Sequence, residues 1–150
     1  MKICIDSDET GAPQREALIE FIAAMGHYVR PLCYPLGNFY PDMSMGVAHA
    51  VQKHYFDRGI ILCGTGQGVA MMANKVRGIY ACPCYHAEWA PKLARNYNAQ
   101  VLTLGCQINT LDEMKAIVKA YLDTPFEPRP NMLRMRELEN MLYDDTPDTW

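Results

Sequence analysis

The stretch Gly59-Ile60-Ile61-Leu62-Cys63-Gly64-Thr65-Gly66-Gln67-Gly68 sets the fold class of this protein. Residues 59–63 are apolar without alternation, which is typical of a strand buried on both faces of a parallel sheet. The glycines at 64, 66 and 68 then allow a sharp turn, and the residues after them have helical spacing. A buried strand, a glycine-rich loop (residues 64–68, the glycine loop) and a helix form one unit of an α/β protein.

The same alternation of strand and helix continues on both sides of this unit. We expect strands at 2–6, 28–33, 59–63, 79–82 and 101–104, and helices at 14–25, 43–55, 69–75, 87–96 and 110–122. A loop is predicted at Pro35, Gly37 and Pro41, and Thr110 is the predicted N-cap of the last helix, with Glu113 three residues on. Because strands that alternate with helices form right-handed crossovers, we expect a Rossmann-like three-layer α/β/α fold with a five-stranded parallel sheet.

A length of 150 residues is typical of one domain. The last part, residues 125–150, differs from the rest because Pro125, Pro128 and Pro130 interrupt the pattern before a further helix at 132–143. That helix has no strand of its own to pack on. We therefore expect a single domain, 1–150, with a C-terminal helical extension that packs on a neighbouring subunit or folds over a site.

Composition and charge argue against several classes of partner. The net charge is −3 and no basic stripe could neutralise many phosphates, so no nucleic acid is expected. No apolar run approaches the ~20 residues that cross a bilayer, and Asp6 comes too early for a signal peptide, so we expect no membrane and a cytoplasmic location. Six cysteines without an export signal do not indicate disulfides, and Cys82-Pro83-Cys84 is too closely spaced for a zinc pair.

Ligands of parallel sheets bind beyond the carboxyl ends of the strands. Three polar segments are expected there: residues 6–11, 63–68 and 105–110. The amides of a glycine-rich turn that opens a helix suit an anion. The glycine loop matches neither the dinucleotide fingerprint, whose third glycine comes one residue later, nor a Walker loop, which needs Gly-Lys-Ser/Thr.

Cys63 is the residue best suited to chemistry, because the start of a helix favours its thiolate. A cysteine phosphatase would need an arginine six residues on, where this chain has Val69. A Cys-His hydrolase needs a histidine partner, and the four histidines of this chain fit no such signature. Two interpretations remain from the residues alone. Cys63 is a proton-transfer base beside amides that stabilise an enediolate, or it is a buried cysteine that ends a strand.

The motifs around Cys63 resemble those of the ribose-5-phosphate isomerase B / galactose-6-phosphate isomerase family of sugar-phosphate isomerases. Asp8 lies where that family has an acid after its first strand, and Phe126-Glu127 followed by Arg134 resembles its C-terminal arginine region. The resemblance extends along most of the chain. The other matching stretches are residues 59–70, Tyr40-Pro41, Ala73-Asn74-Lys75, Gly78-Ile79 and Asn98-Ala99-Gln100-Val101-Leu102-Thr103-Leu104-Gly105.

The resemblance implies an aldose–ketose isomerase of the ribose 5-phosphate/ribulose 5-phosphate type, without metal or organic cofactor. Cys63 would move a proton between C1 and C2, and Thr65 would assist at the sugar oxygens. Arg134, with Arg129 or Arg136, would hold the phosphate. In the family these arginines reach a neighbouring subunit's site, so a homodimer or homotetramer is expected. Substrate contacts are implied for Asp8, Glu9, Tyr40, Gly64, Gly66, Gln67, Gly68, Asn74, Asn96 and Asn98.

Three positions depart from the family pattern. Glu9 replaces a histidine near the phosphate, and its carboxylate would repel a phosphate. Either Glu9 turns away or this end of the substrate is bound differently. Tyr80 replaces an arginine, and Asn96 replaces the histidine assigned to opening the sugar ring. A four-carbon 4-phosphate cannot close a five-membered ring, because its O4 is esterified. A tetrulose phosphate is therefore an alternative substrate, unless His86, Tyr97 or water opens the ring.

Two other functional classes stay open. A non-catalytic or heteromeric subunit could bind a sugar phosphate, since galactose-6-phosphate isomerases use two unlike subunits. Retention of Cys63 and Thr65 favours catalysis, whereas loss of both histidine positions favours a subunit of this kind. A flavodoxin-like nucleotide binder fits the fold but lacks its fingerprint.

Overall fold

The computed structural model describes residues 1–32 and 39–145, and its strands form one sheet. The five strands are all parallel, in the order β2-β1-β3-β5-β4. The register pairs Ile5 with Ile60 and Cys63 with Gly105. The predicted five-stranded parallel sheet is confirmed. The strands are β1 (Lys2–Ser7), β2 (Tyr28–Pro31), β3 (Arg58–Cys63), β4 (Ala81–Pro83) and β5 (Val101–Gly105).

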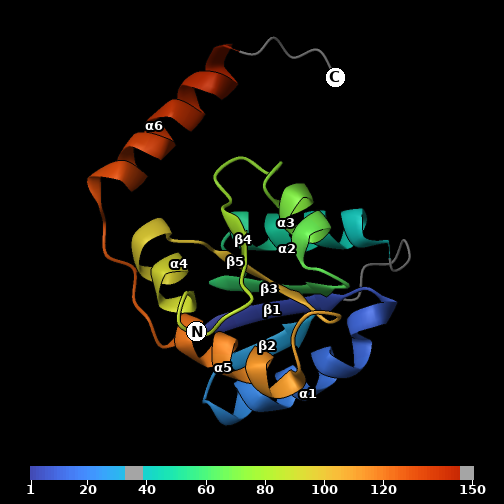
Figure 1. Ribbon diagram of the computed structural model, residues 1–150. Helices are drawn as coiled ribbons and strands as arrows, with labels where there is room; N and C mark the ends of the chain where they lie inside the picture. The colour runs from blue at the N-terminus through green and yellow to red at the C-terminus, as the bar shows by residue number, and fades with distance from the viewer. Residues whose placement is uncertain (33–38, 146–150) are drawn as a thin grey trace.

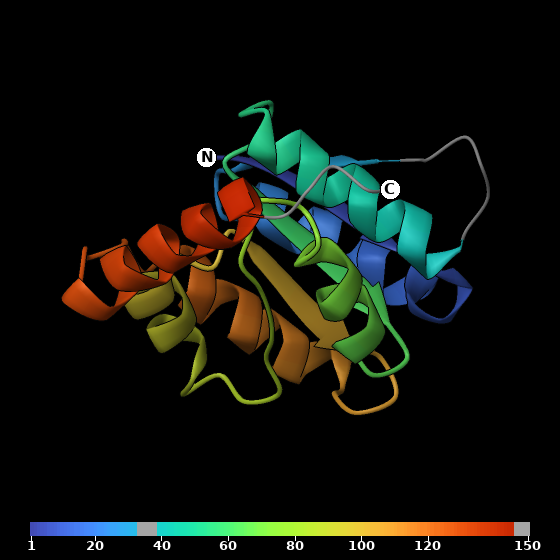
Figure 2. The ribbon, with the colours of Figure 1, turned by 90° about the horizontal axis from the view of Figure 1, so that it is seen from above.

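Helices cover both faces of the sheet, which gives the predicted three layers (Figures 1 and 2). On β3, Ile60 and Leu62 pack on one face, against α1 (Ala12–Ala24), α4 (Ala90–Tyr97) and α5 (Leu111–Leu122). Ile61 and Cys63 pack on the other, against α2 (Tyr40–Gln52) and α3 (Gln67–Ala73). Burial on both faces explains why the β3 sequence is apolar without alternation.

The predicted elements form, but several boundaries differ by two or three residues: the helix expected at 43–55 is 40–52, the strand expected at 79–82 is 81–83, and the helix expected at 87–96 is 90–97. Thr110 caps α5 and forms a capping box with Glu113, as predicted. Pro41, which was expected in a loop, lies in the first turn of α2. Proline is favoured there because its missing N–H has no partner within the helix. Cys33 and the loop predicted at Pro35 and Gly37 lie outside the described residues.

The chain changes direction across the sheet at β1. From β1 it passes to β2 on one side and returns to β3 on the other, so the connections diverge between β1 and β3. Ligands bind at such a switch point, beyond the carboxyl ends of the strands. We call this end of the sheet the carboxyl edge (residues 7–11, 63–68 and 105–107). The opposite end is the amino edge (residues 52–58, 76–80 and 98–100).

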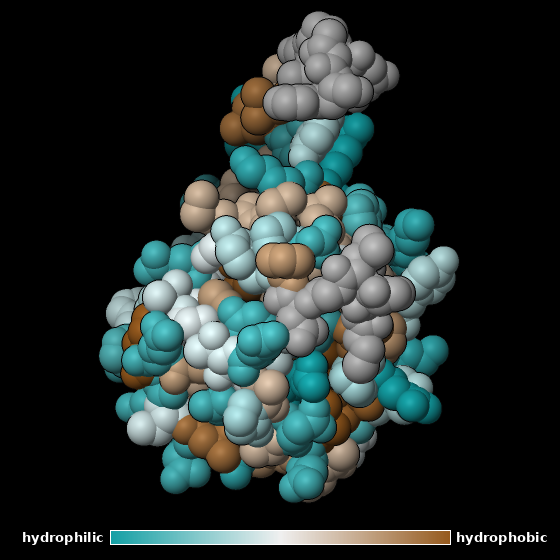
Figure 3. All heavy atoms as spheres, turned by 90° about the vertical axis from the view of Figure 1, so that its right-hand side faces the viewer, coloured by the Kyte–Doolittle hydropathy of each residue, from teal (hydrophilic) through white to brown (hydrophobic). Residues whose placement is uncertain are grey.

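Helix α6 (Pro130–Asp145) projects from the body of the protein near the amino edge (Figure 1). The carboxylate of Glu139 attaches it there, accepting from the Gly78 N–H at 2.7 Å and the Tyr80 hydroxyl at 3.0 Å. Leu133 and Met141 of α6 are exposed. Seen from the carboxyl edge, hydrophilic and hydrophobic side chains are interspersed over the body, beyond which α6 extends (Figure 3). Among the helices of the described residues, none combines the length and apolar character required to cross a membrane.

Candidate active site

Cys63 ends β3 at the carboxyl edge, and its side chain is buried. The N–H of Gly66 donates to the Cys63 Sγ at 3.1 Å. Gly66 has a φ of +77°, and a Cβ there would lie 3.0 Å from the carbonyl carbon of Leu104. A residue with a side chain would be strained in this conformation and crowded against backbone. Glycine at 66 therefore allows the turn that brings its N–H to the sulfur.

Two side-chain hydroxyl groups from other parts of the chain donate to backbone carbonyl oxygens of the glycine loop. The buried hydroxyl of Thr103, on β5, donates to the Gly66 carbonyl oxygen at 2.7 Å. The Tyr85 hydroxyl donates to the Thr65 carbonyl oxygen at 3.0 Å. Gly105 lies so close that a Cβ there would be 2.8 Å from the same Thr65 oxygen. Sequence reasoning missed Thr103 and Tyr85. The available signal was a polar residue within the buried strand 101–105.

Asp8 lies beside Cys63 because β1 and β3 are neighbours. Its N–H donates to the Leu62 carbonyl oxygen at 3.2 Å. Its carboxylate accepts from the backbone N–H groups of Thr10, at 3.0 Å, and Gly11, at 3.3 Å. Asp8 thereby caps the short 3-10 helix η1 (Glu9–Gly11) that leads into α1. Residues 6–11 therefore lie at the same end of the sheet as residues 63–68, as predicted.

A second cysteine lies at the same edge. The N–H of Cys106 donates to the Cys63 carbonyl oxygen at 2.8 Å, so the segment after β5 joins the site as expected. The pKa of the Cys106 thiol is raised to about 11. The main cause is burial, and the negative charges of Asp8 and Cys63 add to it. Cys106 therefore keeps its proton at neutral pH.

Other predicted residues gather around the glycine loop. The Tyr40 ring, from the start of α2, lies against Gly68, where a Cβ would be 3.1 Å from the ring. The Thr65 side chain is exposed and its Oγ1 accepts from the Gln67 N–H at 3.4 Å. Glu9 is exposed, and it lines an open hollow of about 420 Å³ that Asp8 also borders.

Three predicted amides lie away from Cys63 of the same chain. Asn74 follows the last turn of α3, and its side chain bonds the N–H and the carbonyl oxygen of Ala81, both at 2.8 Å. Asn96 lies in the last turn of α4. Asn98 follows it at the amino edge, and its Oδ1 accepts from the Arg58 guanidinium at 3.3 Å. Within one chain these amides are not brought to the glycine loop.

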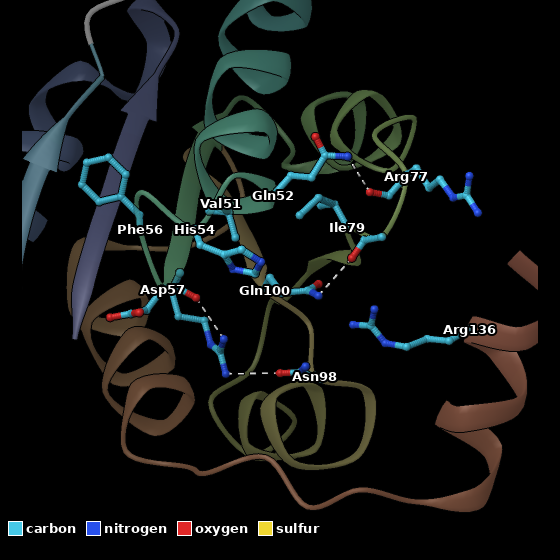
Figure 4. Close-up of a pocket in the computed structure, with 12 residues that line it drawn as sticks. Val51, Gln52, His54, Phe56, Asp57, Arg77, Ile79, Asn98, Gln100 and Arg136 are labelled. Atoms are coloured by element: carbon cyan, nitrogen blue, oxygen red, sulfur yellow. Dashed lines mark hydrogen bonds between the residues drawn. The ribbon is translucent and has the colours of Figure 1, made fainter. Parts of the chain in front are cut away.

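The three predicted phosphate-binding arginines lie in the C-terminal extension. Arg129 pairs with Glu127 at 3.3 Å, and Arg134 pairs with Glu137 at 3.0 Å. The Arg136 guanidinium lies 5.2 Å from the centre of the Tyr80 ring. Arg134 and Arg136 lie on α6, Arg129 directly precedes it, and Arg136 lines a cavity at the amino edge (Figure 4). The structure therefore does not bring these arginines to Cys63 of the same chain.

The groups at the carboxyl edge suit proton transfer next to a developing negative charge. A sulfur held by an N–H lies at the start of a loop whose threonine hydroxyl is exposed. The N–H groups in the first turn of α3 have no acceptors within the helix, so they are suited to an oxyanion. A base next to such donors can form an enediolate and stabilise it.

Comparison with known proteins identifies the family to which this chain is similar. The sequence model of the family described as Ribose/Galactose Isomerase matches residues 3–138. A D-erythrulose-4-phosphate isomerase of Pectobacterium atrosepticum is 35% identical over 130 residues, which cover 85% of this chain and 86% of that protein. A ribose-5-P isomerase B of Listeria innocua is 30% identical over 132 residues, which cover 84% and 86%.

Solved structures of the family have the same fold. The crystal structure of ribose-5-phosphate isomerase B from Mycoplasma genitalium with bound ribulose-5-phosphate has a TM-score of 0.87 and 32% sequence identity to this chain. The match covers 97% of each chain, so it includes the sheet, the glycine loop and most of the C-terminal extension. The chain therefore belongs to the ribose/galactose isomerase family.

Proposed function

We propose that the protein isomerises a small phosphorylated sugar between its aldose and ketose forms, with the Cys63 thiolate as the base. The observation that carries this proposal is the hydrogen bond from the Gly66 N–H to the Cys63 Sγ, at 3.1 Å. It fixes the sulfur at the mouth of a loop of backbone donors. The named activities of the similar proteins, isomerisation of D-erythrulose 4-phosphate and of ribose 5-phosphate, support the same reaction class.

The reaction balances with these groups alone. The Cys63 thiolate takes the proton from C2 of the aldose, and the electron pair of that bond forms the C1–C2 double bond of an enediolate. The negative charge moves to O1, where the amides of the glycine loop and the Thr65 hydroxyl stabilise it. The Cys63 thiol then returns the proton to C1, and the O2 hydroxyl proton passes to O1 as the ketone forms.

Ribose 5-phosphate is one candidate substrate, and a tetrulose phosphate is the second. Asn96 favours the second, because an amide cannot supply the acid that opens a furanose ring. An acyclic four-carbon phosphate needs no such acid. The similarity to a D-erythrulose-4-phosphate isomerase points the same way.

We infer that a second copy of the chain completes the site. Arg134, Asn96 and Asn98 lie away from Cys63 of their own chain, while α6 projects beyond the body. In a homodimer, or a homotetramer built from dimers, α6 would pack on the neighbouring subunit. Arg134, with Arg129 or Arg136, would then hold the phosphate in the neighbour's site. The exposed apolar side chains of α6 that would become buried include Leu133, Met135, Leu138 and Met141.

Assays of the purified protein on ribose 5-phosphate, the tetrulose 4-phosphates and galactose 6-phosphate test this proposal. A Cys63→Ala variant is expected to lose about 1000-fold in kcat while its circular dichroism is unchanged. Cys82→Ala, which removes a thiol from β4, is the matched control and should keep the wild-type rate. A Cys63→Ala variant that keeps more than about a tenth of kcat would contradict the role of base. No turnover of any substrate by the wild-type protein would favour a non-catalytic or heteromeric subunit.

A further inference from the structure

Four consecutive carbonyl oxygens at the start of the glycine loop, those of residues 63–66, accept hydrogen bonds from other parts of the chain. Three of the donors lie on β5 or in the turn after it, and the fourth, Tyr85, lies in the segment after β4. In the order of the acceptors, the donors are the Cys106 N–H at 2.8 Å, the Gln107 N–H at 2.9 Å, the Tyr85 hydroxyl at 3.0 Å and the Thr103 hydroxyl at 2.7 Å. A side chain from outside β5 thus takes part in holding the loop.

The Tyr85 bond reaches the peptide unit that contacts the sulfur. The Thr65 carbonyl oxygen and the Gly66 N–H belong to one planar trans peptide, so they point in opposite directions. The oxygen accepts from the Tyr85 hydroxyl at 3.0 Å, and the N–H donates to the Cys63 Sγ at 3.1 Å. Hydrogen bonds in such a chain polarise one another, by about 10–30% per bond. The Tyr85 hydroxyl therefore both orients the Gly66 N–H and strengthens its bond to the sulfur.

The main chain around Tyr85 is fixed to β5 and to the turn after it. Asn109, which is only 8% exposed, donates from its Nδ2 to the Tyr85 carbonyl oxygen at 2.8 Å. The Asn109 N–H in turn donates to the Gly105 carbonyl oxygen at 2.9 Å. On the other side of Tyr85, the Cys84 N–H donates to the Thr103 carbonyl oxygen at 3.1 Å. Contacts within the body of the protein therefore place the Tyr85 ring.

We propose that Tyr85 is a positioning residue for the proton transfer, because its hydroxyl directs the Gly66 N–H at the Cys63 sulfur. The inference rests on the proposed role of Cys63 as the base. Water that replaced the hydroxyl would not be fixed to the body of the protein, so the Thr65–Gly66 peptide would be free to turn away from the sulfur. A thiolate with a weaker hydrogen bond is less stable relative to the thiol, so fewer molecules would carry the charged base at a given pH. Asn109 acts one step further away, through the main chain of Tyr85.

Alkylation measures the Cys63 thiolate without an isomerase assay, because iodoacetamide reacts with the thiolate and not with the thiol. Trypsin cleavage after Arg58 and after Lys75 releases a peptide in which Cys63 is the only cysteine. The labelling rate of this peptide, followed by mass spectrometry across a range of pH, gives the midpoint of the Cys63 profile. Other titratable side chains at the carboxyl edge stay unchanged in the variants compared below, namely Asp8, Glu9, Tyr40 and Cys106.

Tyr85→Phe keeps the ring and removes only the hydroxyl. We expect the Cys63 midpoint to rise by about 0.5 pH unit, which corresponds to about threefold less thiolate at a given pH. Tyr28→Phe is the matched control, because it removes a hydroxyl from β2 that accepts from Arg30 at 2.8 Å, and it should leave the midpoint unchanged. Asn109→Ala should raise the midpoint as well. The double variant should raise it no further than the larger of the two single changes, since both act through one bond.

Kinetics separate this role from a purely structural one. Below the midpoint, the kcat of Tyr85→Phe should be about threefold lower than that of the wild type with KM within about twofold, and above the midpoint the two kcat values should converge. A midpoint that moves by less than about 0.1 pH unit, or by the same amount in Tyr28→Phe, would overturn the proposal. Failure of the proposed function gives a different result, because Cys63→Ala then stays active while the Tyr85→Phe midpoint still rises. That result would withdraw the positioning role of Tyr85 together with the role of Cys63.

Discussion

The N–H of Gly66 donates to the Sγ of Cys63 across 3.1 Å, and this contact depends on the neighbouring strand. Thr103, buried on β5, holds the carbonyl oxygen of the same glycine at 2.7 Å. One peptide turn is therefore bonded on one side to the sulfur and on the other to the core of the sheet. The position of Cys63 is set by β5 as much as by β3.

Replacing Gly66 by alanine should damage this turn. The left-handed backbone costs alanine about 1–2 kcal/mol, and the new Cβ would lie 3.0 Å from the carbonyl carbon of Leu104. We expect a loss of at least that stability in urea unfolding and a fall of about tenfold or more in kcat. Gly26→Ala is the matched control, because Gly26 has a φ of +86° with nothing within 4 Å of a Cβ. It should lose stability and keep kcat. Equal kcat values for both variants would contradict the role given to the Gly66 turn.

Removing the Thr103 hydroxyl should loosen the glycine loop without touching the substrate. Thr103→Val leaves the Gly66 carbonyl oxygen without its buried donor, which costs about 1–3 kcal/mol. We expect kcat to fall with KM nearly unchanged, and Thr103→Ser to recover both stability and kcat. Unfolding curves and steady-state kinetics measure the two effects. A Val variant that is less stable but fully active would limit Thr103 to a purely structural role.

Much of the fold could be predicted because the local patterns and the packing agree. The apolar run at 59–63 is buried on both faces of the sheet, and the Thr110–Glu113 capping box forms where it was expected. Pro41 was assigned to a loop and lies in a helix. Proline is common both in loops and in the first turn of a helix. The sequence alone therefore does not separate these two positions.

The site was predictable only in part. Asp8 and Tyr40 were found through the family resemblance. Asp8 bonds to Leu62, the residue before Cys63, and the Tyr40 ring lies against Gly68. Thr103 and Tyr85 were missed because local sequence does not determine their bonds to the loop. The Thr103 bond depends on the register of β5, and the Tyr85 bond depends on the course of the chain after β4. Asn98 lies at the amino edge because α4 runs antiparallel to the strands and ends there. A match between sequence motifs does not show the direction of this helix.

The attachment of α6 should depend on Glu139. Glu139→Ala removes both the bond to the Gly78 N–H and the bond to the Tyr80 hydroxyl. We expect limited proteolysis within residues 130–143 to become several-fold faster, with a smaller effect for Tyr80→Phe, which removes one bond. Glu137→Ala is the control, because its exposed pair with Arg134 is worth only ~0–1 kcal/mol. Equal cleavage rates for the Glu139 and Glu137 variants would show that α6 is attached by other contacts.

The Cys106 thiol should react slowly until the pH is high. With a pKa of about 11, about one molecule in 1000 carries the thiolate at pH 8, and the fraction rises tenfold per pH unit. Iodoacetamide labelling followed by peptide mass spectrometry should show a Cys106 rate that still climbs above pH 9. Asp8→Asn removes a negative charge that contributes to the raised pKa, so the pH profile should move to lower pH. A rate that levels off near pH 8.5, the range of an ordinary thiol, would contradict this assignment.

Asn96 provides the sharpest test of the substrate. If the natural substrate is acyclic, the site needs no acid for ring opening, and Asn96→His should add one. We expect kcat/KM for ribose 5-phosphate to rise about tenfold, which is below the range of full general-acid catalysis because the surrounding residues are not adapted to the imidazole. Activity on erythrulose 4-phosphate serves as the internal control and should stay within about twofold, since that substrate has no ring to open. The opposite result is that the wild-type protein turns over ribose 5-phosphate well and that His86→Gln or Tyr97→Phe removes this activity. In that case His86 or Tyr97 opens the ring, and Asn96 does not indicate an acyclic substrate.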